Sequence, residues 1–361
     1  MTHPAGAPGS SEPLPPVSDD SGRPRLVALV VTYNRRAQLH RTIDRLLAED
    51  VDAVLVVDNA SDDGSTEFLY KITDPRLHVI ALADNIGGAG GFEQGLREVA
   101  ARFDPDWCVL MDDDARPEPG VMSRFLARAR TLERGGYEAV AGGVFYPDGR
   151  ICEMNRPSRN PFWHIRSFLR TAIGGGGRAG FHLADADYAG TDPLTIDAAS
   201  FVGFFLSRKG VARAGFPNGN LFIYADDVIY TLRLTRMGGR IGFLPDLRFE
   251  HDCSTYRQGG GDIYRPLWKV YYNYRNSLLA YRVAAGPILF WPVCALAVVK
   301  WRFRARHAGK DQPAYIALLR LAVGDALRHH LTRTLTEVRR IARHPEQDPA
   351  TAAAGHQPRR K

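Results

Sequence analysis

Three consecutive carboxylates, Asp112, Asp113 and Asp114, follow an apolar run and are the residues of this chain best suited to chemistry. The run, residues 107–111, has the character of a buried strand. Carboxylates gathered at the carboxyl end of a parallel strand repel one another unless a cation lies between them. The triplet therefore predicts a divalent metal ion that holds a diphosphate, and a solvated acidic turn is the alternative. Residues 115–120 are expected to form a turn.

A second acidic pair, Asp226 and Asp227, follows the aromatic residues 221–224 and precedes a helical pattern at 228–233. One carboxylate in this position is explained as a helix N-cap. The other, Asp227, is then free to point into a cleft as a general base. The sequence leaves both interpretations open.

His251 follows a strand-like segment at residues 241–244. A lone histidine is most often an ordinary core or surface residue. Here it is placed to give a neutral imidazole nitrogen to the cation of the Asp triplet, a mixed ligand set that suits Mn²⁺ or Mg²⁺. Cys253 is a softer ligand nearby, but the sequence of this region suggests nothing else that completes a zinc site.

Short apolar runs alternate with helical patterns before the Asp triplet and are expected to form the strands that position it. They lie at residues 26–31, 54–57, 77–82 and 107–111. This alternation predicts an α/β fold with a mostly parallel, doubly wound sheet, in which ligands bind beyond the carboxyl ends of the strands. Polar residues that fall on this edge, besides the Asp triplet, are Thr32, Asn34, Arg35, Asp58, Asn59, Asp84 and Asn85.

A glycine-rich segment at residues 87–91 precedes a helix expected from 92 to about 102. It lacks the Lys-Ser/Thr of a phosphate-binding P-loop. We expect Gly87 and Gly88 to let the backbone approach a ligand at the start of a helix, where amide groups favour an anion. A flexible turn is the alternative.

Length and composition are those of a globular protein with disordered ends. The chain has 361 residues, 45% of them hydrophobic and 24% charged, which allows one large core or two modest ones. Residues 1–24 and 345–361 are expected to be disordered tails, and 25–255 a catalytic domain. Four cysteines without paired spacing fit a reducing, cytoplasmic setting. Residues 146–192 are expected to form a long loop over the active site.

Residues 256–344 are expected to form a helical, basic region, and much of the net charge of +7 lies there. This asymmetry indicates an anionic surface nearby, either lipid headgroups or nucleic acid. The apolar stretch 283–299 is short for a membrane-spanning helix and is interrupted by prolines. Its basic and aromatic flank at 300–306 favours attachment to a membrane surface over a buried core helix. A helix around 316–323 is expected to lie along the same surface.

Five segments, in order, resemble the motifs of family 2, GT-A-fold inverting glycosyltransferases over residues 25–255. They are residues 30–35, 56–61, 84–88, 112–114 and 226–227. The glycine-rich segment and the Asp triplet are similar to those of actinobacterial galactofuranosyltransferases that build cell-wall galactan. The length of the chain and residues 272–276 resemble the members that initiate this polymer on a rhamnose-containing, lipid-linked primer.

This resemblance implies a GT-A, Rossmann-like fold and a role for each matching residue. Asp58 would contact uracil or ribose, Asp112 and Asp114 would bind ribose and metal, and His251 would complete the metal site. Asp227 would be the base. The tryptophan often found before the acidic pair is replaced by Tyr224-Ala225.

The implied reaction is transfer of galactofuranose from UDP-galactofuranose to a lipid-linked glycan at the cytoplasmic face of the membrane, with the protein peripherally attached. A rhamnosyltransferase that uses dTDP-rhamnose shares much of the pattern. A nucleotidyltransferase, which would release pyrophosphate, is an alternative enzyme. A basic scaffold or nucleic-acid-binding protein is the non-enzymatic alternative, and the ordered motifs argue against it; we expect no nucleic-acid partner.

Overall fold

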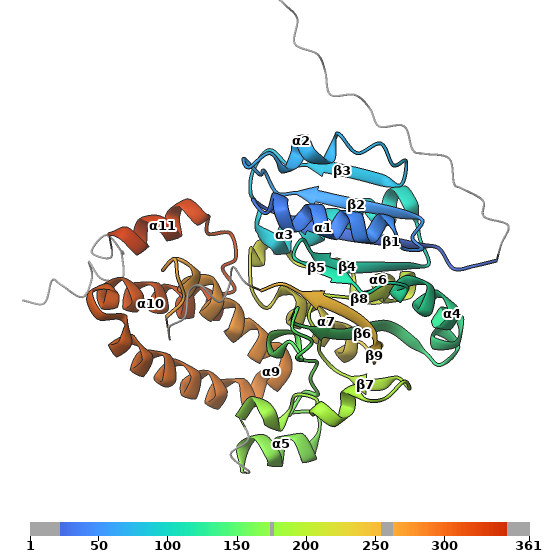
Figure 1. Ribbon diagram of the computed structural model, residues 1–361. Helices are drawn as coiled ribbons and strands as arrows, with labels where there is room; N and C mark the ends of the chain where they lie inside the picture. The colour runs from blue at the N-terminus through green and yellow to red at the C-terminus, as the bar shows by residue number, and fades with distance from the viewer. Residues whose placement is uncertain (1–21, 174–176, 254–262, 345–361) are drawn as a thin grey trace, which may run out of the picture.

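The computed structural model describes residues 22–173, 177–253 and 263–344, and its centre is one nine-stranded mixed sheet with helices on both faces (Figure 1). The strand order is β3-β2-β1-β4-β8-β6-β9-β5, and β7 also pairs with β9. The strands are β1 (Leu26–Thr32), β2 (Ala53–Asp58), β3 (Leu77–Ala81), β4 (Trp107–Asp112), β5 (Ala115–Pro117), β6 (Tyr137–Phe145), β7 (Leu194–Ile196), β8 (Phe204–Ser207) and β9 (Arg240–His251).

The first half of the sheet is parallel, as the sequence predicts. Strands β3, β2, β1 and β4 pair in parallel, so their carboxyl ends meet at one edge. The second half is mixed, because β8 runs antiparallel to both β4 and β6, whereas β6 and β9 are parallel. The α/β class with a Rossmann-like half is confirmed, and the later strands make the complete sheet a mixed one.

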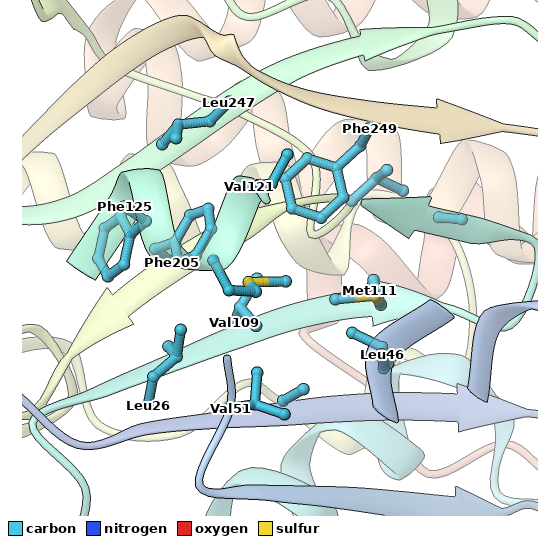
Figure 2. Close-up of a cluster of buried hydrophobic side chains, with 14 of the residues drawn as sticks. Leu26, Leu46, Val51, Val109, Met111, Val121, Phe125, Phe205, Leu247 and Phe249 are labelled. Carbon is cyan, nitrogen blue, oxygen red and sulfur yellow. The ribbon is translucent and has the colours of Figure 1, made fainter. Parts of the chain in front are cut away.

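Apolar side chains on the two faces of the sheet form two cores, because successive side chains of a strand point to opposite faces. In one core, Val109 and Met111 of β4 pack with Phe125 and Phe205 (Figure 2). The rings of Phe125 and Phe205 stack at 3.9 Å between centroids. These contacts fix the position of β4, and with it the Asp triplet at its end.

Helices cover both faces and form a separate layer at the carboxyl end of the chain (Figure 1). They are α1 (Arg36–Leu47), α2 (Ser65–Leu69), α3 (Gly87–Glu98), α4 (Val121–Arg134), α5 (Ile165–Ala172), α6 (Arg208–Ala214), α7 (Asp226–Arg236), α9 (Lys269–Arg304), α10 (Gln312–Arg328) and α11 (Leu335–Arg343). A third core joins α9, on both sides of its bend, to α10 and α11.

Several boundaries differ from the prediction. Residues 115–117 form the strand β5 rather than part of a turn, because they pair with β9. The helix expected from residue 92 begins at Gly87, and its pattern ends in a π-helical turn at Val99–Phe103. The long loop expected at 146–192 contains the helix α5. The predicted tails, at 1–24 and 345–361, lie outside the described residues except for 22–24, which precede β1.

Helix α9 bends at Gly286, where φ is 71° and Pro287 follows. The residues before the bend are mostly buried, whereas many after it are exposed, including Ile288 and Leu296. The helical stretch Lys269–Arg328 is long and apolar enough to cross a membrane, by length and composition alone. Since 11% of its most apolar window is buried, a buried core helix is a poor description of this segment.

Candidate active site

A cavity of about 570 Å³ lies over the carboxyl ends of β1, β2 and β4. Helices α9 and α11 contribute the opposite wall through Lys269 and Arg339. Most of the predicted site residues meet here, although they are spread over more than two hundred positions of the chain. Those that line the cavity are Thr32, Arg35, Asn59, Asn85, Gly87, Gly88, Asp112, Asp113, Asp114 and His251.

Asp112, Asp114 and His251 form a compact cluster, with one ligand atom from each within 4.8 Å of the others. The pairing of β5 with β9 produces this cluster, because it sets Ala115 opposite His251. Nε2 of His251 then lies 3.1 Å from a carboxylate oxygen of Asp114. Two carboxylates and an imidazole are a donor set that suits Mn²⁺ or Mg²⁺.

The electrostatics of the cluster show that it favours a cation. Burial and the charge of Asp114 raise the pKa of Asp112 to about 6. Burial opposes protonation of His251, but its hydrogen bonds to Asp114 and Cys152 and the nearby carboxylates raise its pKa to about 10. The carboxylates that raise this pKa would stabilise a divalent ion in the same way, so the residues present fit a metal site.

Arg35 and Asp113 form ion pairs and hydrogen bonds at the same carboxyl edge of the sheet. Asp113 accepts a hydrogen bond from Oγ1 of Thr32 at 2.7 Å, and burial raises its pKa to about 7. The guanidinium of Arg35 forms ion pairs with Asp113 and Asp114. Asp113 therefore stabilises the start of the loop after β1. The carboxylates available to a metal ion are those of Asp112 and Asp114.

Asn59 connects the second strand to the glycine-rich helix. Its side-chain oxygen accepts from the amide of Ile86 at 2.9 Å, and its amide donates to the carbonyl of Gly87 at 2.8 Å. Asn85 accepts from the amide of Gly87 at 2.8 Å. These bonds fix the first turn of α3 beside the cavity.

The glycines of this segment mainly permit close packing. Gly87 has a φ of +78°, and a Cβ there would collide with the carbonyl oxygen of Phe222. A Cβ at Gly91 would meet Val31 of β1, whereas one at Gly88 would meet nothing within 4 Å. Of the glycines expected to approach a ligand, Gly88 has the open space that this requires.

Four predicted residues do not line the cavity: Asn34, Asp58, Asp84 and Asp227. Asp58 is fully buried, and its carboxylate accepts hydrogen bonds from the amide of Ser61 at 3.0 Å and from Oγ1 of Thr66. In this structure Asp58 therefore shapes the loop after β2. The side chain of Asn34 accepts from the amide of Asp62, which ties the loop after β1 to the same segment.

The acidic pair lies in the first turn of α7, so neither residue is the N-cap, which is Ala225. Burial and the charge of Asp227 raise the pKa of Asp226 well above its usual value. Burial, together with the charge of Asp112, also raises the pKa of Asp227, but to about 6, and its carboxylate accepts the amide of Val228 at 2.7 Å. Burial therefore disfavours the ionised form of both carboxylates.

The loop before Asp226 and Asp227 has a strained backbone, and side chains of α9 hold it through hydrogen bonds. Phe222, Tyr224 and Ala225 all have positive φ, which residues with side chains rarely adopt. The buried side-chain amide of Asn276 donates to the carbonyls of Leu221, Ile223 and Tyr224 at 2.7–3.0 Å. Arg275, also buried, donates to the carbonyls of Leu221 and Asn220 at 2.9 and 3.0 Å.

Sequence reasoning missed part of the site. Lys269 and Arg339 add positive charge to the cavity wall, together with Arg35. The sequence shows that the C-terminal region is basic. It does not show that α9 and α11 contribute residues to the cavity at the edge of the sheet.

The surroundings of His251 correct one prediction. Cys152 lies 4.0 Å from Cys253 and 3.9 Å from Nδ1 of His251, so a second thiol is present where the sequence suggested none. Asn155 accepts a hydrogen bond from Nδ1 of His251 at 2.7 Å, which requires the proton on Nδ1 and directs Nε2 toward Asp114.

A Rossmann-like sheet with acidic side chains and an imidazole at its carboxyl edge defines a GT-A-type glycosyltransferase domain. Residues 27–184 match the sequence model of the family described as "Glycosyl transferase family 2". Residues 27–184 thus match a glycosyl transferase family 2 domain, and the similarity to galactofuranosyltransferases supports a glycosyltransferase of this type.

Similar proteins support this assignment. The chain is 29% identical over 239 residues to "Galactofuranosyltransferase GlfT1" of Mycolicibacterium smegmatis, which covers 63% of this chain and 71% of the relative. It is 26% identical over 331 residues to "Galactofuranosyltransferase GlfT2" of the same organism, covering 85% of this chain and 48% of the relative. The fold is similar to "Crystal structure of GalNAc-T7 with UDP, GalNAc and Mn2+", with a TM-score of 0.53, 13% identity, and coverage of 94% of this chain and 59% of that one.

Proposed function

We propose that this glycosyltransferase transfers galactofuranose from UDP-galactofuranose to a lipid-linked acceptor that contains rhamnose or galactofuranose, in the synthesis of cell-wall galactan. The observation that carries the proposal is the cluster of Asp112, Asp114 and His251 inside the 570 Å³ cavity. The names of the similar mycobacterial proteins support the choice of sugar.

The positive side chains of the cavity suit a nucleoside diphosphate. Arg35, Lys269 and Arg339 line the same space as the acidic cluster. Two phosphates carry negative charge that these groups would balance. A divalent ion held by the cluster would stabilise the charge that develops on the departing UDP.

Asp227 is proposed as the general base of a single displacement with inversion. The acceptor oxygen attacks the anomeric carbon as the bond from that carbon to the diphosphate oxygen breaks. The acceptor proton passes to the carboxylate of Asp227, and UDP leaves with the electron pair. A base with a pKa of about 6 is ionised at neutral pH and can accept this proton.

The second half of α9 is proposed to attach the protein to the cytoplasmic face of the membrane, where a lipid-linked acceptor would be found. Exposed apolar residues there, such as Ile288 and Leu296, precede the basic residues Lys300 and Arg302. This order suits a helix at the boundary between acyl chains and headgroups.

A donor screen tests the proposal. The full chain is incubated with UDP-galactofuranose, UDP-glucose or dTDP-rhamnose, with and without a lipid-linked rhamnosyl acceptor, in Mn²⁺ or in EDTA. We expect acceptor-dependent release of UDP from UDP-galactofuranose, and loss of this release in EDTA. Preference for dTDP-rhamnose would replace the donor assignment, and release of pyrophosphate from a nucleoside triphosphate would indicate a nucleotidyltransferase instead.

A further inference from the structure

We propose that α5 is a second membrane-binding element, which forms with the second half of α9 one surface that docks on an anionic lipid bilayer. This inference extends the membrane attachment proposed above to a segment of the chain that lies more than a hundred residues before the bend of α9. It assigns a role to the part of residues 146–192 that the sequence suggested would be a loop over the active site.

The amphipathic pattern of α5 is reversed relative to that of an ordinary surface helix. Ile165, Phe168, Leu169 and Ile173 recur at the spacing of one helix face. Their exposed fractions are 70%, 37%, 45% and 75%, and α5 contains no buried residue. The apolar face of this helix therefore points away from the protein.

The polar side of α5 is the side that packs on the protein. Ser167 and Thr171 are partly buried, and Oγ1 of Thr171 donates to the carbonyl of Ser167 at 2.7 Å. A Cβ at Gly180 would collide with Thr171, so the helix is closely packed against the segment that follows. Rotation of α5 to bury its apolar face would break this packing.

Hydrogen bonds tie the start of α5 to the bend of α9. The side-chain amide of Asn160 donates to the carbonyl of Ala284 at 3.0 Å, two residues before Gly286. The carboxylate of Asp197 accepts the amide of Asn160 and a ring nitrogen of His164, each at 2.7 Å. Figure 1 shows α5 at the bottom of the view and α9 above it, to the left of the sheet.

The exposed stripe of α9 begins just beyond this connection. Ile288, Leu296, Val299 and Phe303 fall on one helix face and are 81%, 72%, 53% and 64% exposed. Trp291, nearby, is 58% exposed. The two exposed apolar helix faces, linked through the bond from Asn160 to Ala284, are the kind of exposed apolar surface that marks a membrane or partner site.

The positive charges around these two helix faces favour an anionic bilayer as the partner. Arg166 and Arg170 are exposed on α5, and Lys300 and Arg302 are exposed on α9. Residues 163–173 and 283–306 contain no Asp or Glu. Apolar side chains bordered by basic groups match the acyl chains and the acidic headgroups of such a bilayer.

Flotation of the full chain with lipid vesicles tests the inference without any sugar donor, so its outcome is independent of the proposed reaction. Vesicles of phosphatidylcholine alone are compared with vesicles that also contain phosphatidylglycerol. We expect binding to the anionic vesicles, and about tenfold or greater weakening when Ile165→Ser and Ile173→Ser are combined. The matched control combines Tyr70→Ser and Met237→Ser, which change side chains that are 65% and 51% exposed elsewhere, and should bind as the native chain does.

A second measurement locates α5 directly. Phe168→Trp should add fluorescence that brominated acyl chains quench, whereas Tyr70→Trp should add fluorescence that they do not quench. Native-like binding by the Ile165→Ser/Ile173→Ser variant, or absence of added quenching at position 168, would overturn the inference. Equal binding to neutral and anionic vesicles would also overturn it. The same holds if the native chain forms an oligomer that does not bind vesicles and if the double variant dissociates that oligomer.

Discussion

The side-chain amide nitrogen of Asn276 lies 2.7 Å from the carbonyl oxygen of Ile223, 53 residues earlier in the chain. This bond joins α9 to the loop that leads into Asp226 and Asp227. Three residues of the loop have positive φ, and the structure must supply the contacts that keep them there. The helix proposed to attach the protein to a membrane thus also holds the loop in front of the proposed base.

Replacement of Asn276 by alanine should lower kcat by about 10- to 100-fold, because a small displacement of the base misaligns it with the acceptor. UDP affinity should fall less than kcat, since Asn276 bonds to the loop before the acidic pair and not to the Asp triplet or His251. Asn273→Ala, on the same helix but less buried, is the control. Titration with UDP and steady-state rates give both values, and a native kcat in Asn276→Ala would remove the positioning role.

Asp227→Asn should lower kcat by about 10²- to 10⁴-fold without weakening UDP binding, because it removes the proposed proton acceptor. Asp226→Asn is the matched control. Burial and the charge of Asp227 raise the pKa of Asp226 and so favour its neutral form, for which the amide is a close substitute, and this variant should have a much smaller effect. Comparable losses in the two variants would argue against the assignment of the base to Asp227.

The rate should depend on pH through the same carboxylate. Because the pKa of Asp227 is raised to about 6, the base is ionised above that pH and becomes protonated below it. We expect kcat to level off above about pH 6 and to fall as the pH decreases further. At saturating Mn²⁺, which keeps Asp112 ionised, the residual activity of Asp227→Asn should lack this decrease, and a profile with the same acidic limb in both proteins would contradict the prediction.

Asn155→Ala should weaken Mn²⁺ binding by about 10- to 100-fold, because Nδ1 of His251 would lose the acceptor that orients its ring. Calorimetric titration of the protein with Mn²⁺ measures this directly. Asn155→Asp retains an oxygen acceptor and should restore much of the affinity. Equal Mn²⁺ affinity in the native and alanine proteins would show that the ring is oriented by other contacts.

Gly87→Ala should destabilise the fold by roughly 1–3 kcal/mol, because the residue has positive φ and its Cβ would collide with the Phe222 carbonyl. Gly88→Ala is the neighbouring control, since a Cβ there meets nothing within 4 Å and alanine favours a helix by about 1 kcal/mol. Urea unfolding of both variants checks the difference. If the two substitutions changed the free energy of unfolding equally, the close approach of α3 to Phe222 would not contribute to stability.

The sequence determined the elements whose pattern is local. The apolar runs of β1, β2 and β4 were recognisable because strands buried on both faces are continuously apolar, whereas β3 is a half-buried strand at the end of the sheet. Their parallel order followed from alternation with helices, and it brought Thr32, Asn59 and Asp112 to one edge. The acidic residues were recognisable because clustered carboxylates need a compensating cation wherever they are buried.

Only the tertiary structure decided which residues far apart in the sequence line the cavity at the carboxyl edge of the sheet. His251 reaches Asp114 because β9 pairs with the short strand β5, which sequence reasoning took for a turn. Asp58 lies at the carboxyl end of β2, where its carboxylate accepts hydrogen bonds from Ser61 and Thr66, and its contact with a nucleotide stays a prediction. Contacts between residues far apart depend on how whole elements pack, and the local pattern of a chain carries little information about that packing.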